Sequence, residues 1–259
     1  MIDLGPALLR DSELRVEGRL VAASNATLLC RLGGPEGVRC VYKPVSGERP
    51  LWDFPDGTLA AREVAAFLVS EAAGWHVVPP TVLRDGPLGP GMCQLWIDED
   101  GTELVDVVAR DAVPGGWLRV LDADNGAGEP VTLVHADDRQ LRRMALFDVV
   151  VNNADRKGGH VLVAADGTVL GVDHGVCFHV EPKLRTVLWG WSGTPLADEE
   201  QDMLTGLVGA LLGGLGKQLE SLLAPAEVAA TVKRIDALLT EGRLPGPGAT
   251  RMPIPWPPF

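Results

Sequence analysis

Short alternations of hydrophobic and polar residues fill the first hundred positions, and this pattern predicts β-strands separated by Gly- and Pro-containing turns. One stretch differs, because apolar residues recur at helical spacing from Leu59 to Ala73 and Gly74 follows as a stop. We therefore predict an antiparallel sheet with one helix. The expected strands are Leu14–Val21, Thr27–Leu32, Val38–Lys43, Val77–Leu83 and Met92–Ile97.

The pattern changes after residue 100. Residues 100–135 are polar and Gly-rich, and we interpret them as a connector with short elements. Asp138–Val151 follows a helical period, and Ala197–Gly242 does so again. Between these helices, the stretches Val161–Ala164 and Val169–Val172 surround Asp166-Gly167, which predicts a tight hairpin.

A β-rich first half followed by a mainly helical second half predicts a two-lobed α+β fold. We expect the N-lobe at residues 1–98, the C-lobe at 99–244 and a proline-rich tail at 245–259. The tail is expected to be extended. It could bind an aromatic groove of a protein partner, or it could fold back on its own domain.

The charge of the chain excludes several classes of function. The 259 residues carry 23 Lys and Arg against 35 Asp and Glu, a formal net charge of −12. Because nucleic-acid binding needs a basic face, we expect no nucleic-acid partner, and no docking on anionic membranes by charge. The longest uncharged stretch, Met203–Gly216, is too short for stable membrane insertion. With four cysteines and no CxxC pair, we expect a cytoplasmic protein.

Candidate chemistry begins at the predicted hairpin. With a two-residue turn at Asp166-Gly167, His160 faces Asp173, and Asp155 lies close by in the preceding loop. An imidazole and carboxylates placed together can hold a divalent cation. A loop carboxylate such as Asp155 can orient or deprotonate a hydroxyl group.

The helix before this loop carries a related feature. Asp148 shares the apolar helix face of Leu141 and Ala145, so we expect it to be buried. A buried carboxylate needs partners, and Arg156 and the loop amides are the nearest candidates. The alternative is a purely structural Asp148 that caps the next turn.

A second set of candidate residues lies in the first half. A loop at Gly33–Gly37 places Lys43 opposite Thr27, and Glu63 can reach this lysine from the predicted helix. The turn that contains Ser24, Asn25 and Thr27 could turn backbone N–H groups toward phosphates. A lysine held by a glutamate beside a phosphate-binding turn is the arrangement by which kinases hold ATP.

Taken together, these residues resemble the phosphatidylinositol 3-/4-kinase-like catalytic domain in a short actinobacterial form, which is related to type II phosphatidylinositol 4-kinases and HipA-type kinases. The resemblance covers about residues 14–215. It implies that Lys43 holds ATP phosphates and Glu63 positions this lysine. It also implies a catalytic loop at Asp155-Arg156 and a metal-binding aspartate, Asp173. Adenine would bind along the strand that ends in Leu95, Trp96 and Ile97.

One position departs from the family pattern, because His160 replaces the asparagine expected five residues after the catalytic aspartate. An imidazole suits softer metals than Mg²⁺, so Mn²⁺ is expected to support activity better. The alternative is that His160 binds no metal and the chain is a weak kinase or a pseudokinase.

We therefore expect an ATP-dependent phosphotransferase that uses Mg²⁺ or Mn²⁺ and phosphorylates a hydroxyl group. The loop after Asp173 has only Lys183 and Arg185 as strong cations. This favours a protein or a soluble inositol-like acceptor over a lipid. Two alternatives stay open: an ATP-binding pseudokinase that regulates a protein partner, and an enzyme that transfers AMP on the same fold.

Overall fold

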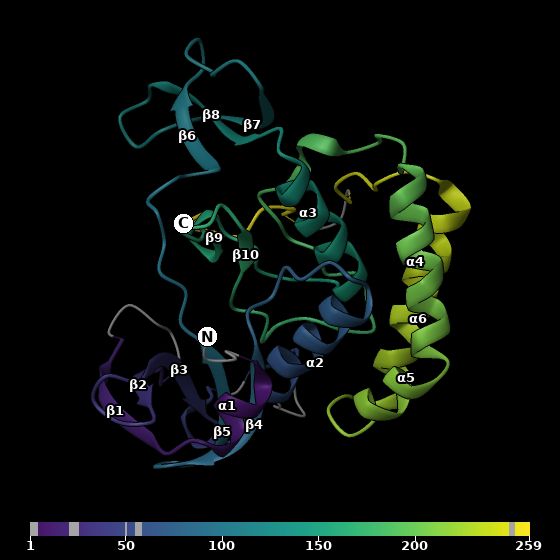
Figure 1. Ribbon diagram of the computed structural model, residues 1–259. Coiled ribbons are helices and arrows are strands. Elements are labelled where there is room, and N and C mark those ends of the chain that lie inside the picture. The colour runs from purple at the N-terminus through teal and green to yellow at the C-terminus, as the bar shows by residue number, and fades with distance from the viewer. Residues whose placement is uncertain (1–4, 21–25, 50, 55–58, 249–251) are drawn as a thin grey trace.

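A five-stranded antiparallel sheet forms the N-terminal part of the computed structural model, which describes residues 5–20, 26–49, 51–54, 59–248 and 252–259. Its strand order is β1-β2-β3-β5-β4. Helices α1 (Pro6–Asp11) and α2 (Leu59–Ala72) contact β4 and β5 (Figure 1). The strands are β1 (Leu14–Arg19), β2 (Leu28–Leu32), β3 (Val38–Pro44), β4 (Thr81–Gly86) and β5 (Gly89–Leu95).

Local chemistry explains the register and the ends of these elements. Leu32 pairs with Val38 across the glycine loop, which is the predicted register. Strand β4 begins at Thr81, later than predicted, because Pro79 and Pro80 have no N–H group for the ladder. At the start of α2, the Glu48 carboxylate accepts hydrogen bonds from the Leu59 and Ala60 amides, two groups without partners inside the helix.

The connector predicted for residues 100–135 is wrong. These residues form a second, three-stranded antiparallel sheet of β6 (Val105–Ala109), β7 (Trp117–Asp124) and β8 (Pro130–Ala136), in the order β6-β8-β7. The sheet stands apart from the first one (Figure 1). Most of β7 faces solvent, and its pairing with β8 shifts register between Arg119 and Leu121, so its apolar residues do not alternate strictly with polar ones along the sequence.

Helices dominate the rest of the chain, as predicted. They are α3 (Arg139–Val151), α4 (Asp198–Leu211), α5 (Gly214–Leu219) and α6 (Pro225–Glu241), and α3 begins with its N-terminal amides bonded to the Asp138 carboxylate. The hairpin of β9 (Val161–Val163) and β10 (Val169–Gly171) follows α3. Short 3₁₀ turns lie at Val45–Gly47, Gly158–His160 and Trp189–Trp191. The mixed α+β class is confirmed.

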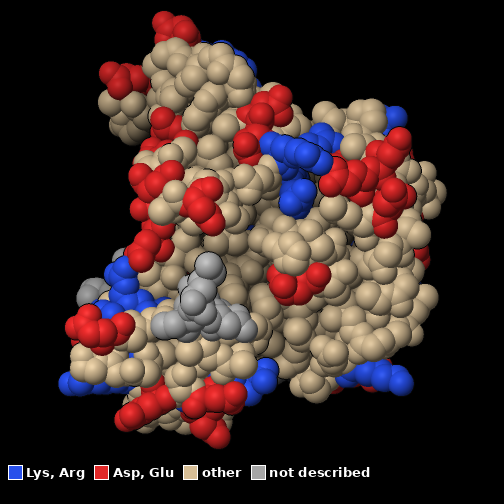
Figure 2. Space-filling model, viewed as in Figure 1, with Lys and Arg blue, Asp and Glu red and all other residues tan. Residues whose placement is uncertain are grey.

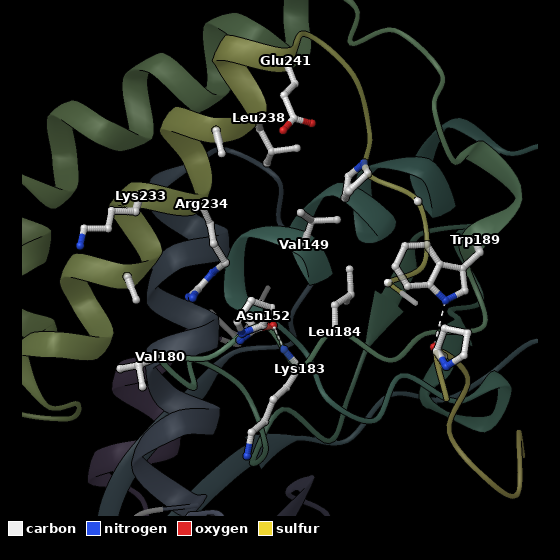
Figure 3. Close-up of a pocket in the computed structure, with 17 residues that line it drawn as sticks. Val149, Asn152, Val180, Lys183, Leu184, Trp189, Lys233, Arg234, Leu238 and Glu241 are labelled. Atoms are coloured by element: carbon white, nitrogen blue, oxygen red, sulfur yellow. Dashed lines mark hydrogen bonds between the residues drawn. The ribbon is translucent and has the colours of Figure 1, made fainter. Parts of the chain in front are cut away.

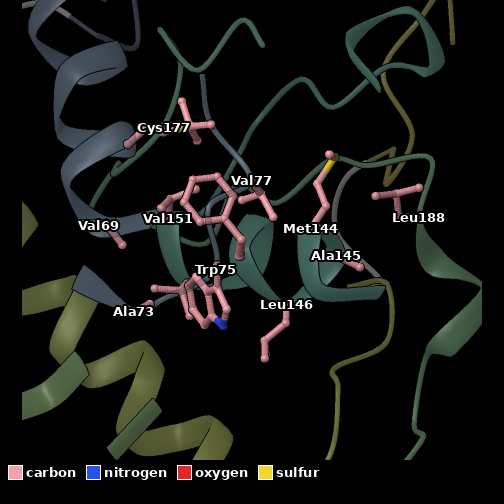
Figure 4. Packing of buried hydrophobic residues seen from close by; sticks show 14 of the residues in the cluster. Val69, Ala73, Trp75, Val77, Met144, Ala145, Leu146, Val151, Cys177 and Leu188 are labelled. Carbon is pink, nitrogen blue, oxygen red and sulfur yellow. The ribbon is translucent and has the colours of Figure 1, made fainter. Parts of the chain in front are cut away.

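The main hydrophobic core joins the two halves of the chain. Figure 4 shows side chains from α2 and the segment after it, such as Val69 and Trp75, meeting Met144 and Val151 from α3. Residues on both sides of the predicted lobe boundary at 98 and 99 therefore share one core, and the division into lobes stays a prediction. Within the described ranges, no helix combines the length and apolar character needed to cross a membrane.

Candidate active site

Three charged side chains from distant parts of the sequence meet beside the first sheet. Lys43 on β3 donates to Glu63 on α2 (Nζ to Oε1, 2.7 Å) and to Asp173 after β10 (Nζ to Oδ1, 2.5 Å). Glu63 is buried, whereas 52% of the Asp173 side chain is exposed. The predicted reach of Glu63 to Lys43 is thus present, and one end of the cluster faces solvent.

Electrostatics keep Lys43 and Asp173 ionised. Burial alone would lower the pKa of Lys43, but the carboxylates of Glu63 and Asp173 outweigh it and raise that pKa. In return, the Lys43 ammonium holds the pKa of Asp173 well below its usual range, against the effect of burial. The backbone of Asp173 is left-handed (φ 65°), a conformation that Asp and Asn tolerate better than most residues.

His160 lies next to Asp173, although the predicted hairpin register is wrong by one residue. The turn has three residues, Ala165 to Gly167, so His160 stands opposite Val172 and accepts its amide through the backbone carbonyl (3.1 Å). The imidazole still reaches Asp173, with His160 Nε2 3.5 Å from Asp173 Oδ2. Burial lowers the pKa of His160 to about 4, so the ring is neutral near pH 7.

The tautomer of His160 bears on metal binding. Its Nδ1 atom accepts a long hydrogen bond from the Lys157 amide (3.5 Å), which favours a proton on Nε2, the atom that faces Asp173. A cation at Nε2 would require this proton to move to Nδ1 and the Lys157 contact to be lost. Asp173 is therefore the better placed of the two predicted metal ligands.

Asp155 lies at the start of the loop between α3 and β9. Its amide donates to Asn153 Oδ1 (3.0 Å), and Asn153 in turn donates to Asp148 (Nδ2 to Oδ1, 2.9 Å), which anchors the turn to α3. Burial raises the pKa of the Asp155 carboxyl, and the positive charges of Lys157 and Arg185 oppose this shift. Such a carboxylate is better suited to accept a proton than a fully solvated one.

Asp148 and Arg156 form a second ion pair, which is fully buried. Arg156 donates to Asp148 through Nε (2.8 Å) and Nη2 (2.9 Å), and neither side chain has exposed surface. Arg156 also donates to the Val172 carbonyl (3.1 Å), so it ties the loop to the β9–β10 hairpin. The predicted burial of Asp148 against Arg156 is confirmed, and the arginine holds the shape of the loop.

Three further residues surround this cluster and were not predicted as members of the site. The buried His174 links the two ion pairs, because its amide donates to Glu63 Oε2 (2.9 Å) and its Nε2 lies 2.6 Å from Arg156 Nη2. Lys157 lies 3.9 Å from Asp155 (Nζ to Oδ2), and Arg185 contributes its charge from the loop after Asp173. Lys157 stands two residues after Asp155, and that spacing was a signal available in the sequence.

Two cavities share Lys43 and Asp173 in their walls. One of about 280 Å³ is lined by the predicted adenine-binding residues Leu95, Trp96 and Ile97, together with Thr27 and His160. The other, of about 360 Å³, contains Glu63 and Asp155. Ser24 and Asn25, predicted to face phosphates, lie outside the described residues.

Acidic side chains gather on the surface near one edge of these cavities. Figure 2 shows acidic side chains along the edge where the chain passes from β5 to β6, a segment with the exposed residues Asp98, Glu99, Asp100 and Glu103.

A larger cavity of about 500 Å³ lies elsewhere, between α6, the loop before Trp189 and the tail (Figure 3). The described residues that line it include none of the predicted site residues, so its size does not make it the active site.

Comparison with known proteins places the chain in a family. Protein Rv2133c of Mycobacterium tuberculosis is 53% identical over 268 residues, which cover 98% of this chain and 95% of that protein. The chain belongs to the family of Protein Rv2133c. No family model matches the sequence.

Kinases are among the proteins that are similar to this chain at lower sequence identity. Phosphatidylinositol 4-kinase gamma 7 of Arabidopsis thaliana is 29% identical over 58% of this chain, and phosphatidylinositol 4-kinase gamma 4 of rice, Oryza sativa subsp. japonica, is 26% identical over 55%. The matched part is 24% of each plant protein. The proinflammatory kinase CtkA of Helicobacter pylori aligns in structure with a TM-score of 0.46 and 9% identity, over 91% of this chain and 94% of CtkA. In sequence, more than half of the chain is thus similar to kinases.

Proposed function

We propose that this protein is an ATP-dependent phosphotransferase that transfers the γ-phosphate to a hydroxyl group of a protein or small molecule. The observation that carries the proposal is the meeting of Lys43, Glu63 and Asp173 where two cavities join, with Asp155 in the wall of one of them. A lysine on the third strand of the sheet, paired with a glutamate on the helix, is the arrangement that positions phosphates in protein kinases.

Each residue then has a distinct task. Lys43 donates to the phosphates of ATP, Glu63 keeps the ammonium in place, and the residues Leu95, Trp96 and Ile97 contact the adenine. Asp155 accepts the proton of the acceptor hydroxyl or orients that hydroxyl toward the phosphate. Lys157 lies beside Asp155, where its positive charge can stabilise the phosphoryl group during transfer.

The residues fit a divalent cation that is shared with the phosphates. Asp173 offers an exposed carboxylate beside Lys43, and His160 lies next to it. Among the described residues there is no group of three His, Cys, Asp or Glu side chains that could hold a metal ion. One or two protein ligands suit Mg²⁺ or Mn²⁺ in phosphate sites, since phosphate and water supply the others. When bound, the cation neutralises charge on the transferred phosphate.

The contacts of the loop after Asp173 favour a protein or soluble acceptor over a phosphoinositide. Lys183, one of its two strong cations, is buried and donates to Asp53 (Nζ to Oδ2, 2.7 Å). Only Arg185 then remains in this loop to attract an anionic headgroup. The relation to phosphatidylinositol 3-/4-kinases and HipA-type kinases therefore concerns the handling of ATP in our proposal, and the acceptor is a separate question.

The test is ATP turnover with Mg²⁺ and with Mn²⁺, in the presence of a panel of inositols, phosphoinositides and a generic protein. Wild-type protein should release ADP and add one phosphate mass to an acceptor. Asp155→Ala should lower the rate by about 10²- to 10⁴-fold. The control Asp236→Ala, exposed on α6, should leave it unchanged. ATP binding without ADP release would support a pseudokinase instead, and an added AMP mass would support the transferase alternative.

A further inference from the structure

The end of the chain, residues 252–259, lies against the two loops that build the candidate active site. The Gly158 amide, in the loop from Asp155 to His160, donates to the Pro258 carbonyl (2.8 Å). The Pro253 carbonyl accepts the Thr186 amide (3.0 Å) and the Trp189 indole N–H (2.9 Å), the latter drawn in Figure 3. In Figure 1 the C-terminus is seen beside the β9–β10 hairpin.

Side chains reinforce these backbone contacts. Ile254 is buried in the main core, which anchors the middle of the segment. At its end, the Phe259 ring covers Gly158 so closely that a Cβ atom added there would lie 2.2 Å from the ring. A larger residue at position 158 would require this ring to move, so the close contact depends on the glycine.

The segment also reaches the cation beside Asp155. Arg185 donates to the Ile254 carbonyl (Nη2 to O, 3.2 Å), while its own amide donates to the Asn153 carbonyl (2.9 Å). On the other side of the Asp155 loop, the Arg156 amide donates to the Arg185 carbonyl (3.0 Å). The loop is therefore held between the segment around Arg185 and the terminal segment. Loss of the terminal segment would leave the Gly158 amide without its protein acceptor.

We propose that residues 252–259 are a strap that fixes the loop of Asp155 and Lys157 in its productive position, and that Phe259 is a positioning residue for phosphoryl transfer. The proposal rests on the proposed function. A small misplacement of a catalytic carboxylate lowers the rate of the chemical step much more than it weakens nucleotide binding. The strap holds Gly158, which lies between Asp155 in the wall of one cavity and Gly159 and His160 in the wall of the other, whereas Leu95, Trp96 and Ile97 come from a different part of the chain.

Three variants of the 259-residue chain and one shortened chain test the strap. Phe259→Ala removes the ring, and a chain that ends at Trp256 removes the Pro258 carbonyl as well. The matched control is Leu212→Ala, since this apolar residue lies outside the strap and is 76% exposed. Phe259→Leu keeps apolar cover over Gly158 and should restore most of what Phe259→Ala loses.

The first readout, amide hydrogen exchange of residues 155–160, needs no activity. We expect faster exchange at Gly158 in Phe259→Ala and in the shortened chain, and wild-type exchange in Leu212→Ala. The second readout is ADP release, where kcat should fall by about ten- to a hundredfold while KM for ATP changes less than about threefold.

The possible results test the strap and the proposed function independently of each other. Unchanged exchange in the shortened chain would overturn the strap, and so would unchanged or increased kcat in an active enzyme. If wild-type protein releases no ADP but Gly158 exchange still accelerates in Phe259→Ala, the phosphotransferase proposal fails while the physical attachment of the loop is retained. A thermal melt of each variant identifies any that do not fold, and Phe259→Leu then carries the test.

Discussion

Two carboxylate–cation pairs lie close together in this molecule and differ in their access to water. Asp148 and Arg156 are sealed from solvent, with no exposed side-chain surface on either partner. Asp173 and Lys43 lie at the junction of two cavities, and 52% of the Asp173 side chain is exposed. The buried His174 links the two pairs, because its ring contacts Arg156 and its amide donates to Glu63, which binds Lys43.

This difference separates a structural task from a chemical one. An ion pair without solvent access cannot contact a substrate. The hydrogen-bonding groups of Asp148 and Arg156 are satisfied by each other and by neighbouring protein groups. An open pair can exchange one partner for a ligand without leaving a buried charge alone, because water or phosphate replaces the lost contact. Stability should therefore depend on Asp148 and Arg156, and activity on Asp173 and Lys43.

The largest expected effect is on the sealed pair. Asp148→Asn keeps the size of the side chain but leaves the Arg156 charge buried without its counter-ion, which should lower the free energy of unfolding by about 3–5 kcal/mol. Urea unfolding followed by fluorescence measures this loss. As a control, Glu199→Gln breaks the exposed pair with Arg139 and should cost no more than about 1 kcal/mol. Equal losses in the two variants would contradict the structural role of the sealed pair.

Next in size is the effect of the open pair on turnover. Asp173→Asn removes the charge of the predicted metal ligand and should lower kcat/KM for ATP by about 10²- to 10³-fold. Asparagine accepts the left-handed backbone at this position, so the free energy of unfolding should change by less than about 1 kcal/mol. ADP release and urea unfolding of the same preparation test both statements. A folded variant with wild-type turnover would remove Asp173 from the mechanism.

The contacts of this site that follow from local spacing could be predicted from the sequence, and the others could not. Lys43 and Glu63 could be paired because the loop at Gly33–Gly37 fixes a strand register and the helix period fixes a face. Asp148 could be assigned to the interior because it shares an apolar helix face. These contacts follow from local rules of spacing, which a single sequence carries.

Other features depend on geometry that spacing does not determine. The turn between β9 and β10 is one residue longer than predicted, yet the His160 ring still reaches Asp173. The sheet of β6, β7 and β8 was missed because a register shift in β7 interrupts its alternation of apolar and polar residues. The strap contacts its loops through the carbonyls of Pro253, Ile254 and Pro258, groups that every residue possesses and no sequence pattern distinguishes.

The smallest expected effect is that of His135, which is buried and forms no ion pair with any described residue. Its contribution to stability therefore reports the cost of burying an imidazole without a counter-ion. His135 on β8 has no exposed surface, and its ring lies 4.3 Å from that of Trp191. Its Nε2 accepts the Gly190 amide (3.0 Å), which leaves the proton on Nδ1, beside the Ala136 carbonyl. Burial lowers the pKa of His135, although this carbonyl and the charge of Asp137 oppose the shift.

The sign of the pH effect follows from this lowered pKa. Below about pH 6.5 the unfolded chain takes up a proton at His135 and the folded chain does not, so stability falls as the pH drops toward the folded-state pKa. The loss from this one group is at most about 1.4 kcal/mol per pH unit. His135→Gln keeps a hydrogen-bond acceptor for Gly190 but cannot titrate. Urea unfolding at about pH 7.5 and about pH 5.5 should therefore show a smaller loss in this variant than in wild-type protein. An equal loss in both would mean that the other buried histidines, His160 and His174, account for the acid sensitivity.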